Sequence, residues 1–132
     1  MSKVLVRRIL QQYGVQPRRI HDVQKGYRNE SYAVDLPDGR AVNLIIYKRE
    51  AGILGRIKNA NYVGNFLAEQ GMPARRTADP RIIKLQGERT EKYTALYDYL
   101  PGKTIPWEAY TKDHIKQLGK TMSDMHALLK KL

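Results

Sequence analysis

The end of the chain is the feature that most constrains its fold. Residues 96–100 have the composition of a buried strand, and Pro101-Gly102 ends it because proline cannot donate to a sheet and glycine favours a turn. Further on, Thr111 is a good helix N-cap, and Asp113 lies near the positive end of the helix that follows. The apolar positions of that helix form one stripe: Ile115, Leu118, Met122, Met125 and Leu129. The stripe predicts a partner surface for the helix.

The rest of the pattern predicts an α+β fold with a five-stranded antiparallel sheet. Helices are expected over residues 1–14, 53–70 and 111–132, and strands over residues 19–25, 30–36, 42–48, 81–85 and 92–99. The third strand is apolar almost throughout, so it should lie centrally in the sheet. A doubly wound fold would alternate strands and helices regularly, which this chain does not do.

Length and composition predict one domain over residues 1–132, with residues 19–99 forming the sheet and its crossing helix and residues 100–110 a linker. The chain has 132 residues, 42% of them hydrophobic, which is enough for a real core. It has no cysteine, so neither disulfides nor thiolate chemistry are available. No run approaches the ~20 apolar residues of a membrane span, and the charged N-terminus does not read as a signal peptide, so we expect a cytoplasmic protein without a membrane partner.

The formal net charge of +11 points to anionic partners without choosing among them. The basic residues occur as separate pairs through the chain and form no single basic arm. A solvated surface would explain them, and so would attraction to a nucleotide, a nucleic acid, an anionic lipid or an acidic protein surface. These alternatives stay open on charge alone.

Four local sequences in a consistent order resemble the small lobe of the aminoglycoside phosphotransferase and choline kinase family. Residues 24–32 resemble the family's nucleotide-covering loop, residues 43–48 its third strand, residues 66–73 its helix end and residues 96–102 its hinge. The resemblance covers most of the chain and implies a kinase-like N-terminal lobe whose catalytic C-terminal lobe is absent. For the parent enzyme it implies transfer of a phosphate from ATP with magnesium to a small hydroxylated acceptor.

The resemblance also implies a set of nucleotide-binding residues. Gly26, with Asn29 and Ser31 after it, would let backbone N–H groups approach phosphate oxygens closely. In the hinge, the carbonyl of Asp98 and the N–H of Leu100 would bind the adenine edge. Tyr97 would lie at the back of the pocket, and Tyr99 belongs to the same hinge strand. A plain hairpin turn and a plain strand end are the structural alternatives for these two segments.

Two departures from the family pattern concern the clamp on the nucleotide phosphates. Ile45 stands where the family has a lysine or arginine in the third strand, and an apolar side chain cannot hold a phosphate. Lys48 is a weak substitute, because the two-residue period of a strand points it away from the face of Ile45. The following helix should carry a glutamate that pairs with the cation, but residues 51–68 contain no Asp or Glu.

A third departure concerns catalysis. Phosphoryl transfer in the family needs a His-x-Asp-x-x-x-x-Asn loop and a later aspartate for magnesium, and neither occurs in this sequence. His21-Asp22 precedes the loop resembling the nucleotide cover and does not fit the motif. The sequence therefore predicts a nucleotide-binding lobe that transfers no phosphate on its own, with no catalytic and no metal-binding residues.

Two rival functions remain at this point. The chain could be a basic module that grips a protein or a nucleic acid through its sheet or its last helix. It could also be a degenerate regulatory lobe that forms a homodimer through the apolar stripe of the last helix. Nucleotide binding, salt-dependent binding of nucleic acid and the oligomeric state would separate these possibilities.

Overall fold

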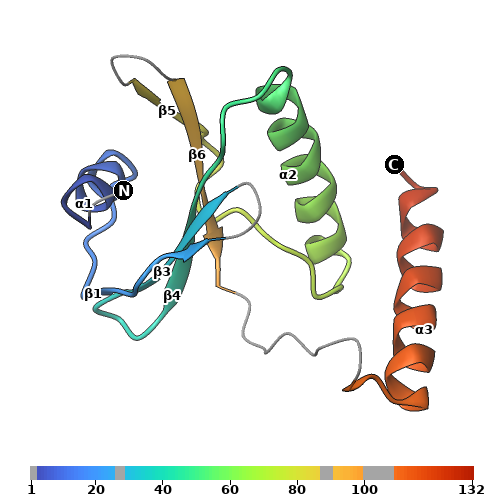
Figure 1. Ribbon diagram of the computed structural model, residues 1–132. Helices are drawn as coiled ribbons and strands as arrows, with labels where there is room; N and C mark the ends of the chain where they lie inside the picture. Colours follow the sequence, from blue (N-terminus) through green and yellow to red (C-terminus); the bar gives the residue numbers. More distant parts are fainter. Residues whose placement is uncertain (1–2, 26–28, 87–90, 100–108) are drawn as a thin grey trace.

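The computed structural model describes residues 3–25, 29–86, 91–99 and 109–132, and within them the chain forms three helices around one antiparallel sheet (Figure 1). The helices are α1 (Lys3–Gln12), α2 (Ile53–Glu69) and α3 (Lys112–Leu129). The strands are β1 (Arg19–Ile20), β2 (Gln24–Lys25), β3 (Glu30–Asp35), β4 (Ala41–Ile46), β5 (Ile83–Gln86) and β6 (Glu91–Asp98). Their order along the sheet is β1-β3-β4-β6-β5, with β2 also paired to β3.

The expected first strand over residues 19–25 is divided into β1 and β2, which share one edge position of the sheet beside β3. Ile20 lies opposite Val34 and Gln24 lies opposite Ser31. From Ile20 to Gln24 the edge advances four residues, whereas β3 advances only three residues between their partners, Val34 and Ser31. One extra residue on one strand is the signature of a β-bulge, which interrupts regular pairing. The sheet thus has five strand positions, as expected, although its edge strand is broken.

Strand β4 lies between β3 and β6, as its apolar sequence predicts. Because side chains alternate along a strand, it divides the sheet into two faces. Val42, Leu44 and Ile46 belong to the face under α1, and they join its core cluster. Ala41, Asn43 and Ile45 belong to the opposite face, which we call the inner face.

Helix α1 covers the first face and supplies much of the core. Its buried residues Val6, Ile9 and Leu10 pack with Tyr32, Val34 and Leu96 of the sheet. Gly14 follows the helix with φ of 72°, the left-handed conformation that commonly closes a helix and that glycine adopts without strain. This packing explains the strongly amphipathic sequence of the first helix.

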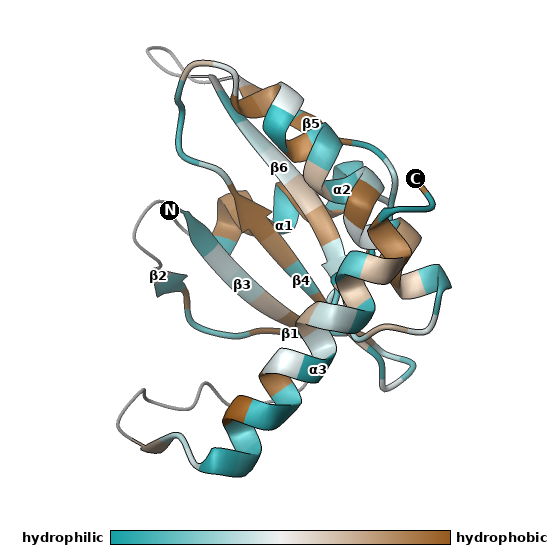
Figure 2. Ribbon diagram, turned by 90° about the vertical axis from the view of Figure 1, so that its right-hand side faces the viewer, coloured by the Kyte–Doolittle hydropathy of each residue, from teal (hydrophilic) through white to brown (hydrophobic). Residues whose placement is uncertain are grey.

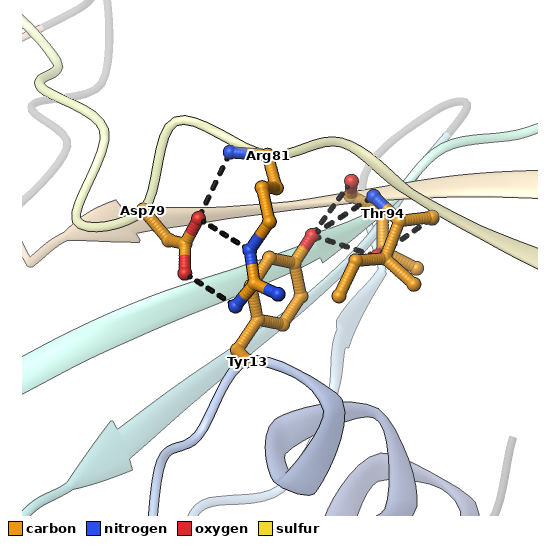
Figure 3. A network of polar contacts seen from close by, with 5 residues as sticks. Tyr13, Asp79, Arg81 and Thr94 are labelled. Atoms are coloured by element: carbon orange, nitrogen blue, oxygen red, sulfur yellow. Dashed lines mark hydrogen bonds and ion pairs between the residues drawn. The ribbon is translucent and has the colours of Figure 1, made fainter.

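Tyr13 ties the end of α1 to the two strands on the far edge (Figure 3). Its hydroxyl lies 2.9 Å from both the carbonyl oxygen and Oγ1 of Thr94, and the N–H of Ile83 donates to it at 3.3 Å. Arg81, paired with Asp79, lies with its guanidinium carbon 5.8 Å from the centre of the Tyr13 ring. The network holds helix and sheet together through a residue that a simple apolar pattern would place in the core.

Helix α2 lies on the other side of the sheet from α1 (Figure 1). Asn65 on this helix accepts from the backbone N–H of Thr77 at 2.9 Å, which ties α2 to the segment leading to β5. Gly64 lies so close to that segment that a Cβ atom would stand 2.6 Å from the carbonyl oxygen of Arg75. Gly71 ends the helical region with φ of 87°, in the left-handed conformation.

Helix α3 lies beside α2 and contributes no buried residue (Figure 1). Thr111 is its N-cap, as the sequence predicts, and accepts from the N–H of His114 at 3.2 Å. The apolar positions Ile115, Leu118 and Met122 are about half exposed. Brown residues accordingly interrupt the teal surface of this helix in Figure 2. Among the described residues, no helix has the length and hydropathy needed to cross a membrane.

Candidate functional site

A cavity of about 310 Å³ opens on the inner face of the sheet. This volume lies at the lower end of the range usual for small-molecule sites. Its walls come from the segment between β1 and β2, from β2, β3 and β4, and from the residue that follows β6. The lining residues are His21, Asp22, Gln24, Ser31, Ala33, Asp35, Ala41, Asn43 and Tyr99.

Hydrogen bonds between neighbouring strands fix the polar groups of this cavity. Ser31 Oγ donates to Asn43 Oδ1 at 2.8 Å, joining β3 to β4. His21 Nε2 lies 2.9 Å from Asp35 Oδ2, joining the edge to β3. Asp22 stands at the exposed rim, where a hydrogen bond from Lys3 lowers the pKa of its carboxyl group. The polar side chains of the cavity are therefore already held in place by hydrogen bonds before any ligand binds.

Of the predicted phosphate-covering residues, Ser31 lines the cavity, Asn29 directly precedes β3 and Gly26 falls outside the described residues. The side-chain oxygen of Asn29 accepts from the backbone N–H of Lys48 at 3.1 Å. This bond holds the start of β3 against the segment after β4. The side chain of Lys48 is exposed and lies beyond the end of β4, so it does not share the cavity.

The predicted hinge residues are placed at one end of the cavity. Tyr97 is buried, whereas Asp98 and Tyr99 are exposed and Leu100 falls outside the described residues. The N–H of Asp98 donates to the carbonyl of Arg76 at 2.9 Å, and that of Tyr99 donates to the carbonyl of Ala41 at 3.3 Å. Tyr99 lines the cavity directly.

An uncharged network lies where the family resemblance predicts a strand cation and a helix glutamate that together hold the nucleotide phosphates. Ile45 is buried in a small cluster with Ala95 and Tyr97 on the inner face, and Tyr47 packs against it. The Tyr97 hydroxyl donates to Asn61 Oδ1 of α2 at 2.6 Å and lies 2.7 Å from the Tyr47 hydroxyl. Since the Tyr97 proton is directed to Asn61, Tyr47 is the donor of the second bond.

Burial is the main reason that the pKa of Tyr47 is raised well above its usual value, and its hydrogen bond to Tyr97 adds to the rise. Arg75 opposes the rise because its positive charge favours the tyrosinate. Its guanidinium carbon lies 4.7 Å from the centre of the Tyr97 ring. A cation is thus present on this face, although no strand residue supplies it.

Sequence reasoning missed Asn43, Asn61 and Arg75. The two-residue period of β3 and β4 could have placed Asn43 beside Ser31, because both belong to the face opposite the apolar core. No comparable signal marks Arg75, which lies in an irregular segment. Within the described part of the chain, no three His, Asp or Glu residues gather as metal ligands would, so we assign no magnesium-binding residues.

Comparison with known proteins supports the architecture. No protein-family model matches the chain, and no curated protein matches it. Among solved structures, it is similar to the amicoumacin kinase hAmiN, solved in complex with AMP-PNP, Ca²⁺ and Ami, with a TM-score of 0.72 and 16% identity. The chain has a kinase-like α+β fold. The match covers 100% of this chain and 43% of the kinase, so this kinase-like chain spans less than half the length of its structural neighbour.

Proposed function

We propose that this kinase-like chain is the nucleotide-binding small lobe of a small-molecule kinase of the aminoglycoside phosphotransferase type, and that it does not transfer phosphate alone. The observation that carries the proposal is the position of the inner-face cavity. The cavity is lined both by β2 and β3, the strands on either side of residues 26–28, and by Tyr99, which follows β6. The similar kinase was solved with a nucleotide analogue, AMP-PNP, which favours the same ligand class for this cavity.

The shape of the cavity suggests how a nucleotide would lie in it. Ala33 and Ala41 leave room above the sheet for a flat base. Polar groups on either side, including Ser31, Asn43 and Asp35, can bond a base edge or a sugar. The base would lie toward Asp98 and Tyr99, and the phosphates toward Asn29 at the other end of β3.

The proposal also assigns the catalytic and metal-binding residues to a second lobe of the parent enzyme. The neighbouring kinase extends well beyond the region matched by this chain. Exposed Ile115, Leu118 and Met122 on α3 offer an apolar surface against which a second lobe could pack. In the parent enzyme, that lobe would supply the carboxylates that bind magnesium and orient the acceptor.

Thermal unfolding with and without ATP tests the nucleotide proposal. ATP should raise the melting temperature more than tripolyphosphate at equal ionic strength, because only ATP carries the base that the cavity would bind. Ala33→Phe should remove this difference by filling the cavity, whereas Ala60→Phe on the exposed side of α2 should keep it. A response to polyphosphate and RNA without a preference for ATP would instead favour the basic binding module.

A further inference from the structure

The guanidinium group of Arg75 covers an aromatic ring on the inner face of the sheet. Its central carbon lies 4.7 Å from the centre of the Tyr97 ring, within the range of a cation–π contact. Tyr97 is only 2% exposed, although Arg75 itself is exposed. The arginine therefore lies as an outer layer over a buried ring.

The direction of the Tyr97 ring shows where on the sheet the Arg75 guanidinium lies. Tyr97 pairs with Asn43 of β4, and its hydroxyl lies 2.7 Å from the hydroxyl of Tyr47, which directly follows β4 and comes two residues after Ile45. The ring therefore extends past the position of Ile45, with which it shares a buried cluster. Arg75 lies over the region into which a strand cation at position 45 would project.

This region is the phosphate end of the proposed nucleotide site. Asn43, directly across from Tyr97, lines the cavity. Arg75 and Tyr97 are not lining residues, and the Arg75 guanidinium lies next to the cavity, over the Tyr97 ring. Tyr99 lines the other end of the cavity, and the backbone of Arg76 lies beside β6 near that end, where its carbonyl accepts from the N–H of Asp98. The Arg75 side chain extends from there over the Tyr97 ring. Ile45 pairs with Ser31 near the start of β3, close to Asn29. To reach Arg75, phosphates extending from a base near Tyr99 would leave the cavity past Asn43.

The guanidinium of Arg75 shares a hydrogen bond with Tyr47, an uncharged partner that leaves its positive charge unneutralised. Three arginines of the described chain are paired with carboxylates: Arg40 with Asp38, Arg56 with Glu50 and Arg81 with Asp79. No ion pair joins Arg75 to a carboxylate within the described residues. A guanidinium stacked on a ring keeps N–H donors at its edge in a fixed fork that matches phosphate oxygens.

The backbone that carries Arg75 is also held firmly. Its carbonyl oxygen packs against Gly64, at a distance that excludes any side chain there. Two residues later, Thr77 is bonded to Asn65 of α2 through both its backbone N–H and its hydroxyl. A fixed backbone lowers the entropy lost when the side chain orders around a ligand.

We infer that Arg75 supplies the cation for the β- and γ-phosphates of a bound nucleotide, in place of the strand cation that Ile45 replaces. The inference rests on the proposed nucleotide function and assigns its phosphate contact to the segment between α2 and β5. Asn61 and Tyr47 keep the Tyr97 ring in position beneath the guanidinium.

The test compares adenosine with ATP, by calorimetric titration of the 132-residue chain and three variants. Arg75→Gln should weaken ATP binding about tenfold or more, the loss expected for a charge-assisted contact, and leave adenosine binding unchanged. Arg75→Lys keeps the charge without the fork and should give an intermediate loss. Arg76→Gln, the matched control, removes the same charge from the exposed neighbouring residue and should change ATP affinity less than twofold.

Adenosine binding shows that each variant keeps the cavity intact, and Arg75→Lys decides the question if Arg75→Gln does not fold. Equal ATP affinity in wild type and the Arg75 variants, with adenosine still bound, would overturn the inference but not the proposed function. Equal losses in the Arg75 and Arg76 variants would also overturn it, because they would show a general charge effect. A wild-type chain that binds neither adenosine nor ATP would overturn the proposed function together with the inference.

Discussion

At the scale of single residues, the hydroxyl of Tyr97 on the inner face bonds two side chains, Asn61 and Tyr47. Tyr97→Phe should lower the free energy of unfolding by about 1–3 kcal/mol, because it leaves two partly buried partners without their bond. Chemical denaturation followed by circular dichroism would measure this. Tyr62→Phe is the control; Tyr62 is 68% exposed, so a loss as large there would contradict the explanation.

Tyr47 makes the stability of the protein sensitive to high pH. Its pKa is raised in the folded state, chiefly by burial, so the native chain holds this proton when the unfolded chain has already released it. The contribution is fully present below a pH of about 10, the ordinary tyrosine value, and is lost as the pH rises above it. Denaturation at pH 8 and pH 11 should show a smaller loss for Tyr47→Phe than for wild type. Equal losses would contradict the assignment.

At the scale of elements, the contact between α2 and the segment before β5 depends on Gly64. Gly64→Ala should cost about 1–3 kcal/mol through overpacking, because its Cβ would meet the carbonyl oxygen of Arg75 at 2.6 Å. Gly55→Ala lies on the same helix with open space around it, so it should stabilise the protein by up to about 1 kcal/mol. Thermal unfolding of the two variants should therefore shift in opposite directions, and a stabilising Gly64→Ala would refute the close approach.

The helices and strands and their order could be predicted from the sequence. The residues around the candidate site could be predicted only in part. Periodicity placed the three helices and the central strand, and the Thr111 cap is confirmed. The bulge that divides β1 from β2 was not predicted, because one extra residue leaves little trace in an alternating pattern. Arg75 escaped notice because an irregular segment gives no rule for the direction of its side chains.

At the scale of the whole molecule, α3 should be nearly independent of the sheet. It contributes no buried residue and lies beside α2. Deleting residues 109–132 should therefore change the unfolding free energy of the remainder by no more than about 1 kcal/mol, as is usual for surface changes. Denaturation of the shortened chain measures this, with the full chain as the reference. A loss of several kcal/mol would show that α3 belongs to the same cooperative unit.

The hydrogen bonds that attach α2 to its surroundings determine how the fold responds to ionic strength. The contacts that hold α2, from Tyr97 to Asn61 and from Thr77 to Asn65, join uncharged groups. Dissolved ions screen exposed charges and leave such neutral bonds almost untouched. High salt should therefore release polyanions that are held only by the +11 charge of the chain, without displacing α2. Specific ligands can then be distinguished from charge-driven ones on an intact fold.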